Sequence, residues 1–175
     1  MARRYYRRRR YYRKRKRWST NIDTLDFPLT IGANANSSDG FALCQNGYYT
    51  NNAVKEIYTV KNIEVQYTVE VPTQYLDVIE NLCCYIVYVP EGMTIMNNPN
   101  FIKQHPEYIM AYKYLGTGND DGDNYRNPLY IKSRLSRNLN TGDSIQFMLT
   151  YKNDSSINNI IIRVYGVVRW WSRSN

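Results

Sequence analysis

The first seventeen residues hold the side chains with the clearest chemistry in this sequence. They read MARRYYRRRRYYRKRKR, with nine arginines, two lysines, four tyrosines and no acid. Arginine guanidinium groups pair with phosphates and release the counterions of the nucleic acid, which gives binding that weakens as the salt concentration rises. Tyrosine rings stack on unpaired bases of any sequence. The segment therefore predicts non-specific binding of single-stranded nucleic acid by Arg3, Arg4, Tyr5, Tyr6, Arg7, Arg8, Arg9, Arg10, Tyr11, Tyr12, Arg13, Lys14, Arg15, Lys16 and Arg17.

The same segment has two further properties. A run of like charges repels itself, so we expect the segment to be disordered until it meets a polyanion. Its composition is also that of a nuclear-import signal, which is compatible with nucleic-acid binding. A solubilising tail is a poorer explanation at this density of arginine.

A second group of basic and aromatic residues lies in a strand predicted over 159–171. Alternation directs one face to the core, namely Ile160, Ile162, Val164, Gly166, Val168 and Trp170. The other face carries Ile161, Arg163, Tyr165, Val167, Arg169, Trp171 and Arg173. Three arginines with tyrosine and tryptophan suit a nucleic-acid surface. They suit a contact between subunits as well, because the same residue types are favoured there. The sequence leaves both interpretations open.

Little in the sequence indicates catalysis. His105 is the only histidine, and it stands where a short helix is predicted to end, which favours a structural role. No nucleotide-binding loop or nucleophile motif is present. We therefore expect no enzymatic activity and no cofactor.

Two groups of residues are weak candidates for metal ligands. The acidic loop 119–123 offers Asp121 and Asp123, and hard cations prefer such oxygen ligands. An EF-hand loop needs glycine after its third ligand, where Asn124 stands, so a solvated turn is favoured and no metal site is predicted. The cysteines are odd in number and form no C-x-x-C pair, which indicates buried free thiols in a reducing compartment. They are Cys44, Cys83 and Cys84.

The charges divide the chain in two. The sequence has 23 basic and 15 acidic residues. Eleven of the basic residues lie in 1–17 and all of the acids follow, so residues 18–175 carry 23 − 11 = 12 bases and a net charge of 12 − 15 = −3. We expect a basic arm, 1–17, and one mildly acidic domain, 18–175. No apolar run approaches the ~18 residues of a membrane span, so membrane insertion is not expected.

The domain is predicted to be all-β. Eighteen tyrosines and many β-branched residues favour strands. Strands are predicted at 25–31, 57–71, 82–89, 107–115, 129–136, 144–152 and 159–171, with a weaker eighth at 41–49. Loops are predicted at 32–40 and 116–128, and short helices at 73–81 and 98–104. Strands joined by loops of varied length indicate a sandwich or barrel.

Two of these strands have distinctive patterns. The run 82–89, LCCYIVYV, is apolar throughout, so we expect it to be covered on both faces. The strand 57–71 alternates, with Ile57, Thr59, Lys61, Ile63, Val65, Tyr67, Val69 and Val71 predicted on one side. Tyr58, Val60, Asn62, Glu64, Gln66, Thr68 and Glu70 are predicted on the other.

The whole chain resembles the circovirus-like capsid proteins of circular Rep-encoding single-stranded DNA viruses. The resemblance lies in the arm, in EIYTVKNIEVQYTVEV at 56–71, in NPLYIKSRLSRN at 127–138 and in NNIIIRVYGVVRWWSRSN at 158–175. It implies an eight-stranded jelly roll, a β-sandwich of two packed antiparallel sheets, with no catalytic residues. It also implies about 60 copies in a small icosahedral shell, with the arm directed inward onto the packaged genome.

The resemblance further implies where the protein acts. It would reside in the virion, and in the host nucleus during assembly, reached through the host import machinery. Capsids of small satellite RNA viruses share the plan of basic arm and jelly roll, so an RNA cargo is an alternative to DNA. A non-viral nucleic-acid-binding module with a basic tail is another, although the net charge of −3 on the domain argues against it.

Overall fold

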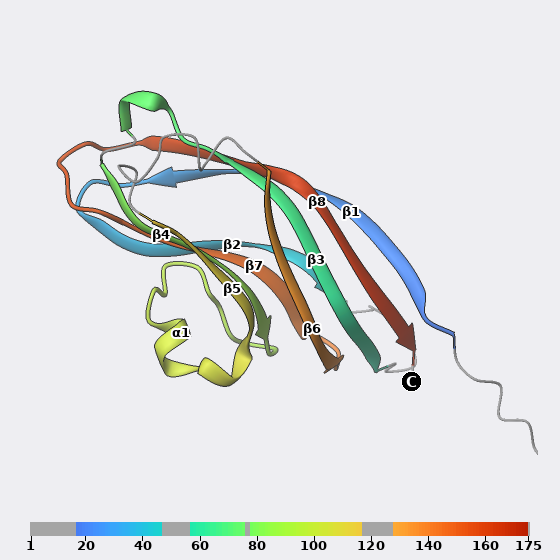
Figure 1. Ribbon diagram of the computed structural model, residues 1–175. Coiled ribbons are helices and arrows are strands. Elements are labelled where there is room, and N and C mark those ends of the chain that lie inside the picture. The colour runs from blue at the N-terminus through green and yellow to red at the C-terminus, as the bar shows by residue number, and fades with distance from the viewer. Residues whose placement is uncertain (1–16, 47–56, 76–77, 117–127, 175) are drawn as a thin grey trace, which may run out of the picture.

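The computed structural model is a sandwich of two antiparallel sheets (Figure 1). It describes residues 17–46, 57–75, 78–116 and 128–174. Within these ranges the strands are β1 (Ser19–Ile31), β2 (Ala35–Gln45), β3 (Tyr58–Glu70), β4 (Ile79–Val89), β5 (Ile109–Gly116), β6 (Leu129–Leu139), β7 (Ser144–Asn153) and β8 (Ile160–Ser174). The prediction of an all-β domain is confirmed.

The order of the strands defines a jelly roll. One sheet has the order β1-β8-β3-β6 and the other has the order β2-β7-β4-β5. Strands β1 and β8, β2 and β7, β3 and β6, and β4 and β5 pair antiparallel. The chain is thus a long hairpin rolled up on itself, and the pairs β3·β8 and β4·β7 complete the two sheets. Both predicted features, the jelly roll and its two packed sheets, are confirmed.

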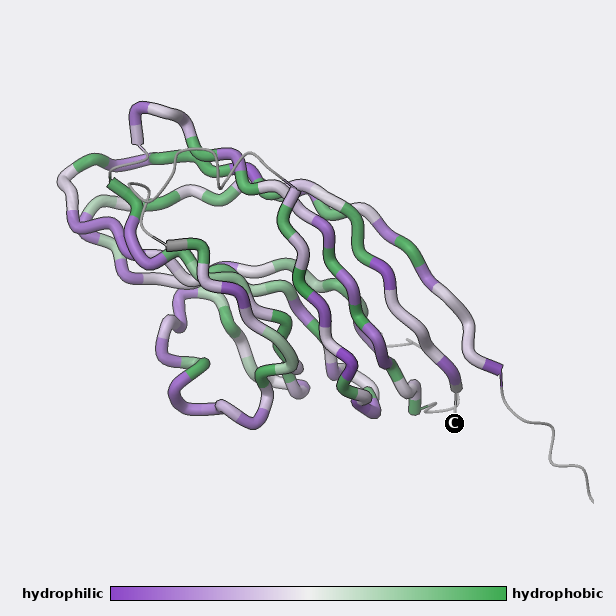
Figure 2. The backbone as a smooth tube through the Cα atoms, viewed as in Figure 1, coloured by the Kyte–Doolittle hydropathy of each residue, from purple (hydrophilic) through white to green (hydrophobic). Residues whose placement is uncertain are grey.

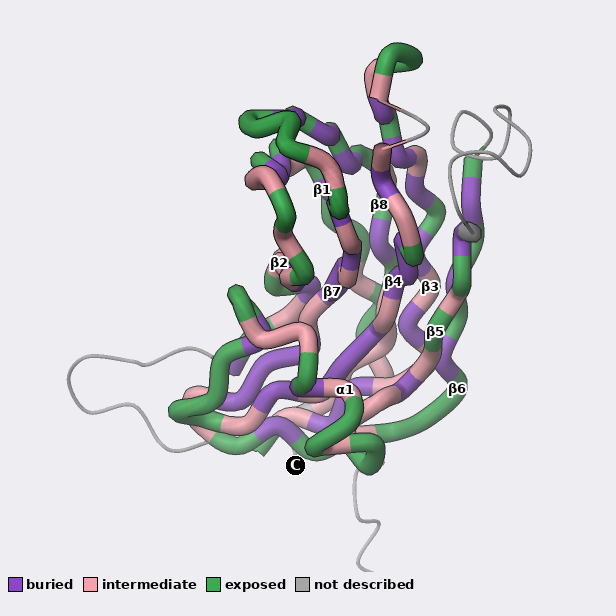
Figure 3. Tube along the Cα trace, turned by 90° about the vertical axis from the view of Figure 1, so that its left-hand side faces the viewer, coloured by how far each residue is buried: buried purple, intermediate pink, exposed green. Residues whose placement is uncertain are grey.

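The main core lies between the two sheets. Hydrophilic and hydrophobic residues alternate along the strands (Figure 2), and buried and more exposed residues alternate along them in the same way (Figure 3). Tyr67 of β3 meets Phe147 of β7 edge-on, with ring centroids 4.9 Å apart. On β8, Ile160, Ile162, Val164 and Val168 are buried as the alternation predicts. The strands therefore pack one face into the core.

A second, smaller core lies on the outer face of the β2-β7-β4-β5 sheet. Val87 and Val89 of β4 and Met148 of β7 are buried there against Phe101. Phe101 begins the single-turn helix α1 (Phe101–Gln104), which covers this face. The other side of β4 packs into the main core through residues such as Ile86. The strand is thus covered on both faces, as its continuous apolar run predicts.

The N-terminal strands differ most from the prediction. Strand β1 begins at Ser19 rather than at residue 25, and β2 covers 35–45 rather than 41–49. The prediction of a loop over 32–40 is therefore wrong for residues 35–40, which belong to β2, and residues 47–49 lie outside the described ranges. Pairing with β7 overrides the weak strand propensity of this segment. Ser38 is buried there, and its hydroxyl donates to the carbonyl of Ile95 at 2.5 Å.

The helices are also shorter than predicted. In the segment predicted as a helix over 73–81, the described residues form a 3-10 turn, η1 (Thr73–Tyr75), and β4 already begins at Ile79. Helix α1 has Asn100 as its N-cap rather than Asn98, whose backbone amide donates to Ser38 Oγ. A second 3-10 turn, η2 (Pro106–Tyr108), follows α1. None of the described helices is long and apolar enough to cross a membrane.

The close approach of β8 to β3 gives a test of the packing. Gly166 pairs with Tyr67, and a Cβ at Gly166 would clash with the Gln66 carbonyl oxygen and lie 2.7 Å from Tyr67 Cα. Both atoms are backbone, so the strands would have to separate. We expect Gly166→Ala to lower the free energy of unfolding by about 3 kcal/mol in urea denaturation. Gly32→Ala is the control, because its nearest neighbour would lie at 3.7 Å, and an equal loss in both variants would contradict this account.

Candidate nucleic-acid interface

The basic arm joins the domain at one end of the β1-β8-β3-β6 sheet. The described chain begins at Arg17, and Ser19 of β1 pairs with Ser172 of β8. Because β1 and β8 are antiparallel, the start of β1 lies beside the C-terminal end of β8 (Figure 1). The predicted arm residues Arg3 to Lys16 lie outside the described ranges, but their point of attachment to the domain is fixed.

Four residues from three parts of the chain meet at this end. Cross-strand register places Trp171 of β8 between Thr20 of β1 and Lys61 of β3, and places Arg173 beside Thr59. Lys61 Nζ lies 4.0 Å from the centroid of the Trp18 ring, and Arg173 Cζ lies 4.8 Å from it. Both distances are those of cation–π contacts. We call Trp18, Lys61, Trp171 and Arg173 the collar; all four are partly exposed.

A bulge in β3 puts Lys61 into the collar. The predicted alternation assigns Lys61 to the same side as Ile63 and Val65, which are fully buried, and this assignment is wrong. Asn62 adopts a positive φ of 50°, and the register with β8 is irregular between Lys61 and Glu64. Val60 therefore takes the core position, with 2% of its surface exposed, and Lys61 turns outward. Asparagine tolerates this conformation, whereas a buried unpaired ammonium would be costly.

Two other outward cations of this sheet have carboxylate partners. Arg163 donates two hydrogen bonds of 3.0 Å to the carboxylate of Asp26 on β1. Lys132 of β6 is bonded to Glu64 of β3, and this hydrogen bond raises the pKa of Lys132. Among the described residues, neither Lys61 nor Arg173 forms an ion pair. Arg134 of β6 and Arg169 of β8 are exposed and form no ion pair among the described residues either, so the unmatched cations of this sheet include the collar but extend beyond it.

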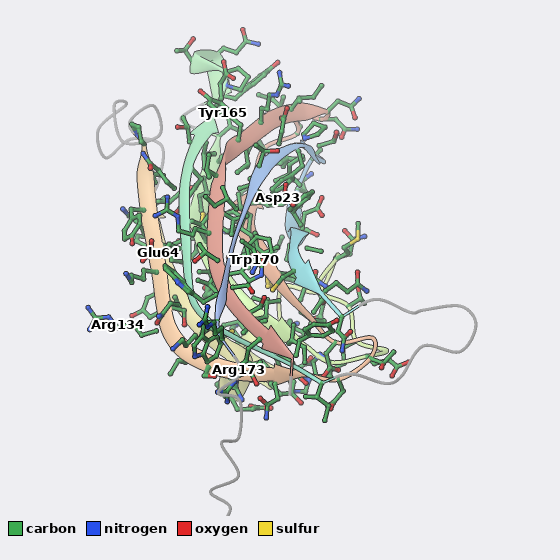
Figure 4. All side chains as sticks on the ribbon, turned by 90° about the vertical axis from the view of Figure 1, so that its right-hand side faces the viewer. Asp23, Glu64, Arg134, Tyr165, Trp170 and Arg173 are labelled. Carbon is green, nitrogen blue, oxygen red and sulfur yellow. The ribbon has the colours of Figure 1, made fainter. Side chains whose placement is uncertain are left out.

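The four residues of β8 that the sequence predicted for nucleic-acid binding therefore lie in different surroundings. Trp171 and Arg173 belong to the collar, while the charge of Arg163 is matched by Asp26. Arg169 is exposed one step along β8 from the collar, beside Glu64 in the register. Figure 4 shows Arg173 near the point where the arm leaves, and Tyr165 toward the other end of the strand. Among the described residues, the outward face of β8 therefore carries unpaired cations at its C-terminal end and an ion-paired arginine toward its start.

The remaining candidate residues from the sequence lie outside the described ranges or away from the collar. Asp121 and Asp123 lie outside the described ranges, within which no group of histidine, cysteine and acidic residues is placed to hold a metal. His105 caps the C-terminal end of α1 and stacks on Tyr108, with centroids 5.2 Å apart. All three cysteines are free thiols, and burial raises the pKa of the Cys84 thiol to about 12.

Sequence reasoning missed two members of the collar. Trp18 directly follows the arm, and only its neighbours across the sheet show that it contacts two cations. Lys61 was hidden because strict alternation assigned it to the core. A lysine at a predicted core position was itself a signal, since an unpaired charge is almost never fully buried.

A search of solved structures finds viral proteins that match this chain over most of its length. Desmodium yellow mottle tymovirus matches with a TM-score of 0.35 and 10% identity, covering 89% of each chain. Turnip yellow mosaic virus matches with a TM-score of 0.37 and 11% identity, covering 89% of this chain and 96% of the other. The decameric BFDV capsid protein matches with a TM-score of 0.36 and 9% identity, covering 91% and 99%.

These likenesses place the chain in no family. No protein-family model and no curated protein sequence matches it. The assignment to the jelly-roll class stands on the chain's own strand order, and the resemblance to circovirus-like capsid proteins remains a prediction.

The pair between Arg163 and Asp26 can be tested by titration. The hydrogen bonds from Arg163 hold the pKa of the Asp26 carboxyl below its usual value. We expect Arg163→Gln to raise this pKa toward the usual value, as followed by carboxyl carbon shifts in NMR. Arg169→Gln is the control and should leave it unchanged. The pair's contribution to stability would be present above the ordinary pKa of about 4 and lost as the pH falls through the lowered one.

Proposed function

We propose that this protein is a capsid subunit that assembles into a small icosahedral shell and packages single-stranded DNA through its basic arm. The observation that carries the proposal is the separation of charge: +11 on residues 1–17 and −3 on the jelly roll that follows. An arm of this kind can bind any polyanion without help from the domain. A domain with a net negative charge needs another task, and contact with further copies is a task that jelly rolls perform.

The surface of the domain suits contact between copies. On the outer face of the β1-β8-β3-β6 sheet, four large apolar or aromatic side chains are between 43% and 61% exposed: Ile22, Ile161, Tyr165 and Val167. They come from two adjacent strands and share the face with the neutral pair of Asp26 and Arg163. Such a surface, with apolar and aromatic residues and matched charges, is typical of subunit interfaces.

The charge of the arm fits the packaging of a genome. A shell of about 60 copies would bring roughly 660 positive charges to its interior, enough to neutralise several hundred phosphates. The four interleaved tyrosines favour a strand with unpaired bases over a duplex. Single-stranded DNA is proposed on the resemblance, and the arm's chemistry would serve single-stranded RNA equally.

Removal of the arm separates assembly from packaging. We expect a protein lacking residues 2–17 to form shells that contain no nucleic acid, because the domain keeps its contacts while the net charge of the chain falls from +8 to −3. Negative-stain microscopy reports the shells, and the ratio of absorbance at 260 and 280 nm reports their content.

The intact protein, expressed alone, is the reference. Its particles should yield nuclease-protected single-stranded nucleic acid, and digestion with DNase or RNase identifies the cargo. An intact protein that stays monomeric at every salt concentration and pH would overturn the capsid proposal. Loss of all self-association without the arm would instead favour a nucleic-acid-binding module.

The exposed apolar residues of β1 and β8 give a separate test of assembly. We expect the double substitution Ile22→Glu and Val167→Glu to raise the subunit concentration needed for assembly about tenfold or more, because buried interface carboxylates cost more than one factor of ten in affinity. Thermal unfolding should change little, since both positions are exposed. Ile157→Glu, at a position 38% exposed in the turn before β8, is the control. Assembly at the wild-type concentration would exclude this face as a contact.

A further inference from the structure

We propose that the collar is a nucleic-acid site of the folded domain itself, which binds the phosphates of a single strand directly beside the arm. This inference rests on the proposed function and extends it from the arm to the folded residues Trp18, Lys61, Trp171 and Arg173. The single-stranded nucleic acid bound by the arm would continue onto the β1-β8-β3-β6 sheet.

The unmatched charge of the collar is the first support. The two cross-strand rows that hold it consist of Thr20, Trp171, Lys61 and Ser136, and of Arg173, Thr59 and Asn138. They contain two cations and no acid. The nearest acid on the face, Glu64 in the next row, is already bonded to Lys132. A polyanion at the collar therefore meets two cations without displacing a carboxylate.

The arrangement of the cations is the second support. Lys61 and Arg173 both contact the ring of Trp18, at 4.0 and 4.8 Å. Arg173 Nε is buried and has no hydrogen-bond partner among the described residues, and the guanidinium lies against the Trp18 ring. The contact keeps two long side chains together on one face before any ligand arrives, which reduces the entropy that binding would cost.

The position of the collar is the third support. Trp18 follows the arm directly, with only Arg17 between it and residues 1–16. A strand bound by the arm is thus held close to the collar, and its local concentration there is high. The partly exposed ring of Trp171, between Thr20 and Lys61, offers a face for an unpaired base.

The salt dependence of binding tests the two cations in the full-length chain. Binding of a fluorescein-labelled oligothymidylate is measured by anisotropy over a series of NaCl concentrations, with the protein too dilute to assemble. Each phosphate contact with a single strand contributes about 0.7 to the slope of log Kobs against log salt. We expect the double variant Lys61→Gln, Arg173→Gln to lower the slope by about 1.4.

Two matched variants control this experiment. Lys103→Gln, Lys113→Gln removes two cations from α1 and β5, near the other sheet, and should leave the slope at its wild-type value. Lys61→Arg, Arg173→Lys keeps both charges and should restore most of the slope. A double glutamine variant with the wild-type slope would overturn the collar site. A wild-type protein without salt-sensitive binding would instead contradict the proposed function.

Tryptophan fluorescence provides a second readout in case the double glutamine variant does not fold. Stacked or nearby bases quench tryptophan emission, so we expect oligothymidylate to quench the full-length protein. In a Trp18→Phe background, which removes the other indole of the collar, Trp171→Phe should remove most of this quenching. Trp170→Phe should retain it, because Trp170 points to the opposite face of β8 and packs against the core. Equal quenching in both variants would exclude stacking on Trp171 and would overturn the collar as a base-contacting site.

Discussion

Every strand of this sandwich has to give one face to the core, and the rest of the structure depends on how strictly that rule is kept. Strand β3 keeps it from Ile63 to Val69 and would break it at Lys61, where an ammonium would enter the apolar layer. The positive φ of Asn62 resets the alternation, so that Val60 replaces Lys61 in the core. A single irregular residue thus preserves the core and delivers a cation to the surface.

The rolled hairpin determines which cations meet. Because β1 and β8 are the first and last strands and pair antiparallel, the two ends of the described chain lie side by side. Trp18 from one end and Arg173 from the other then contact each other, and β3, the next strand of the sheet, adds Lys61. The collar is therefore a product of topology, because the three segments that form it are more than forty residues apart in the sequence.

The outer face of the same sheet combines two kinds of surface. Exposed ion pairs such as Arg163 with Asp26 add little to stability, but they cancel the charge that would otherwise attract a polyanion. Around this pair the face is therefore close to neutral, and the same face exposes apolar side chains, including Ile22 and Val167. Under the proposed function, the collar end would face the nucleic acid and the neutral part would face other copies.

The sequence by itself determined the charge of the arm, the all-β class and the buried face of β8, because composition and a two-residue period are local properties. It also indicated a β4 strand covered on both sides. It misplaced β2, because the polar residues around Ser38 are held in a strand by β7 and by the Ile95 carbonyl, not by their own propensity. Only the tertiary structure decided that Lys61 points outward and that Arg163 is neutralised, since a bulge and a cross-strand partner are set by the neighbouring strands.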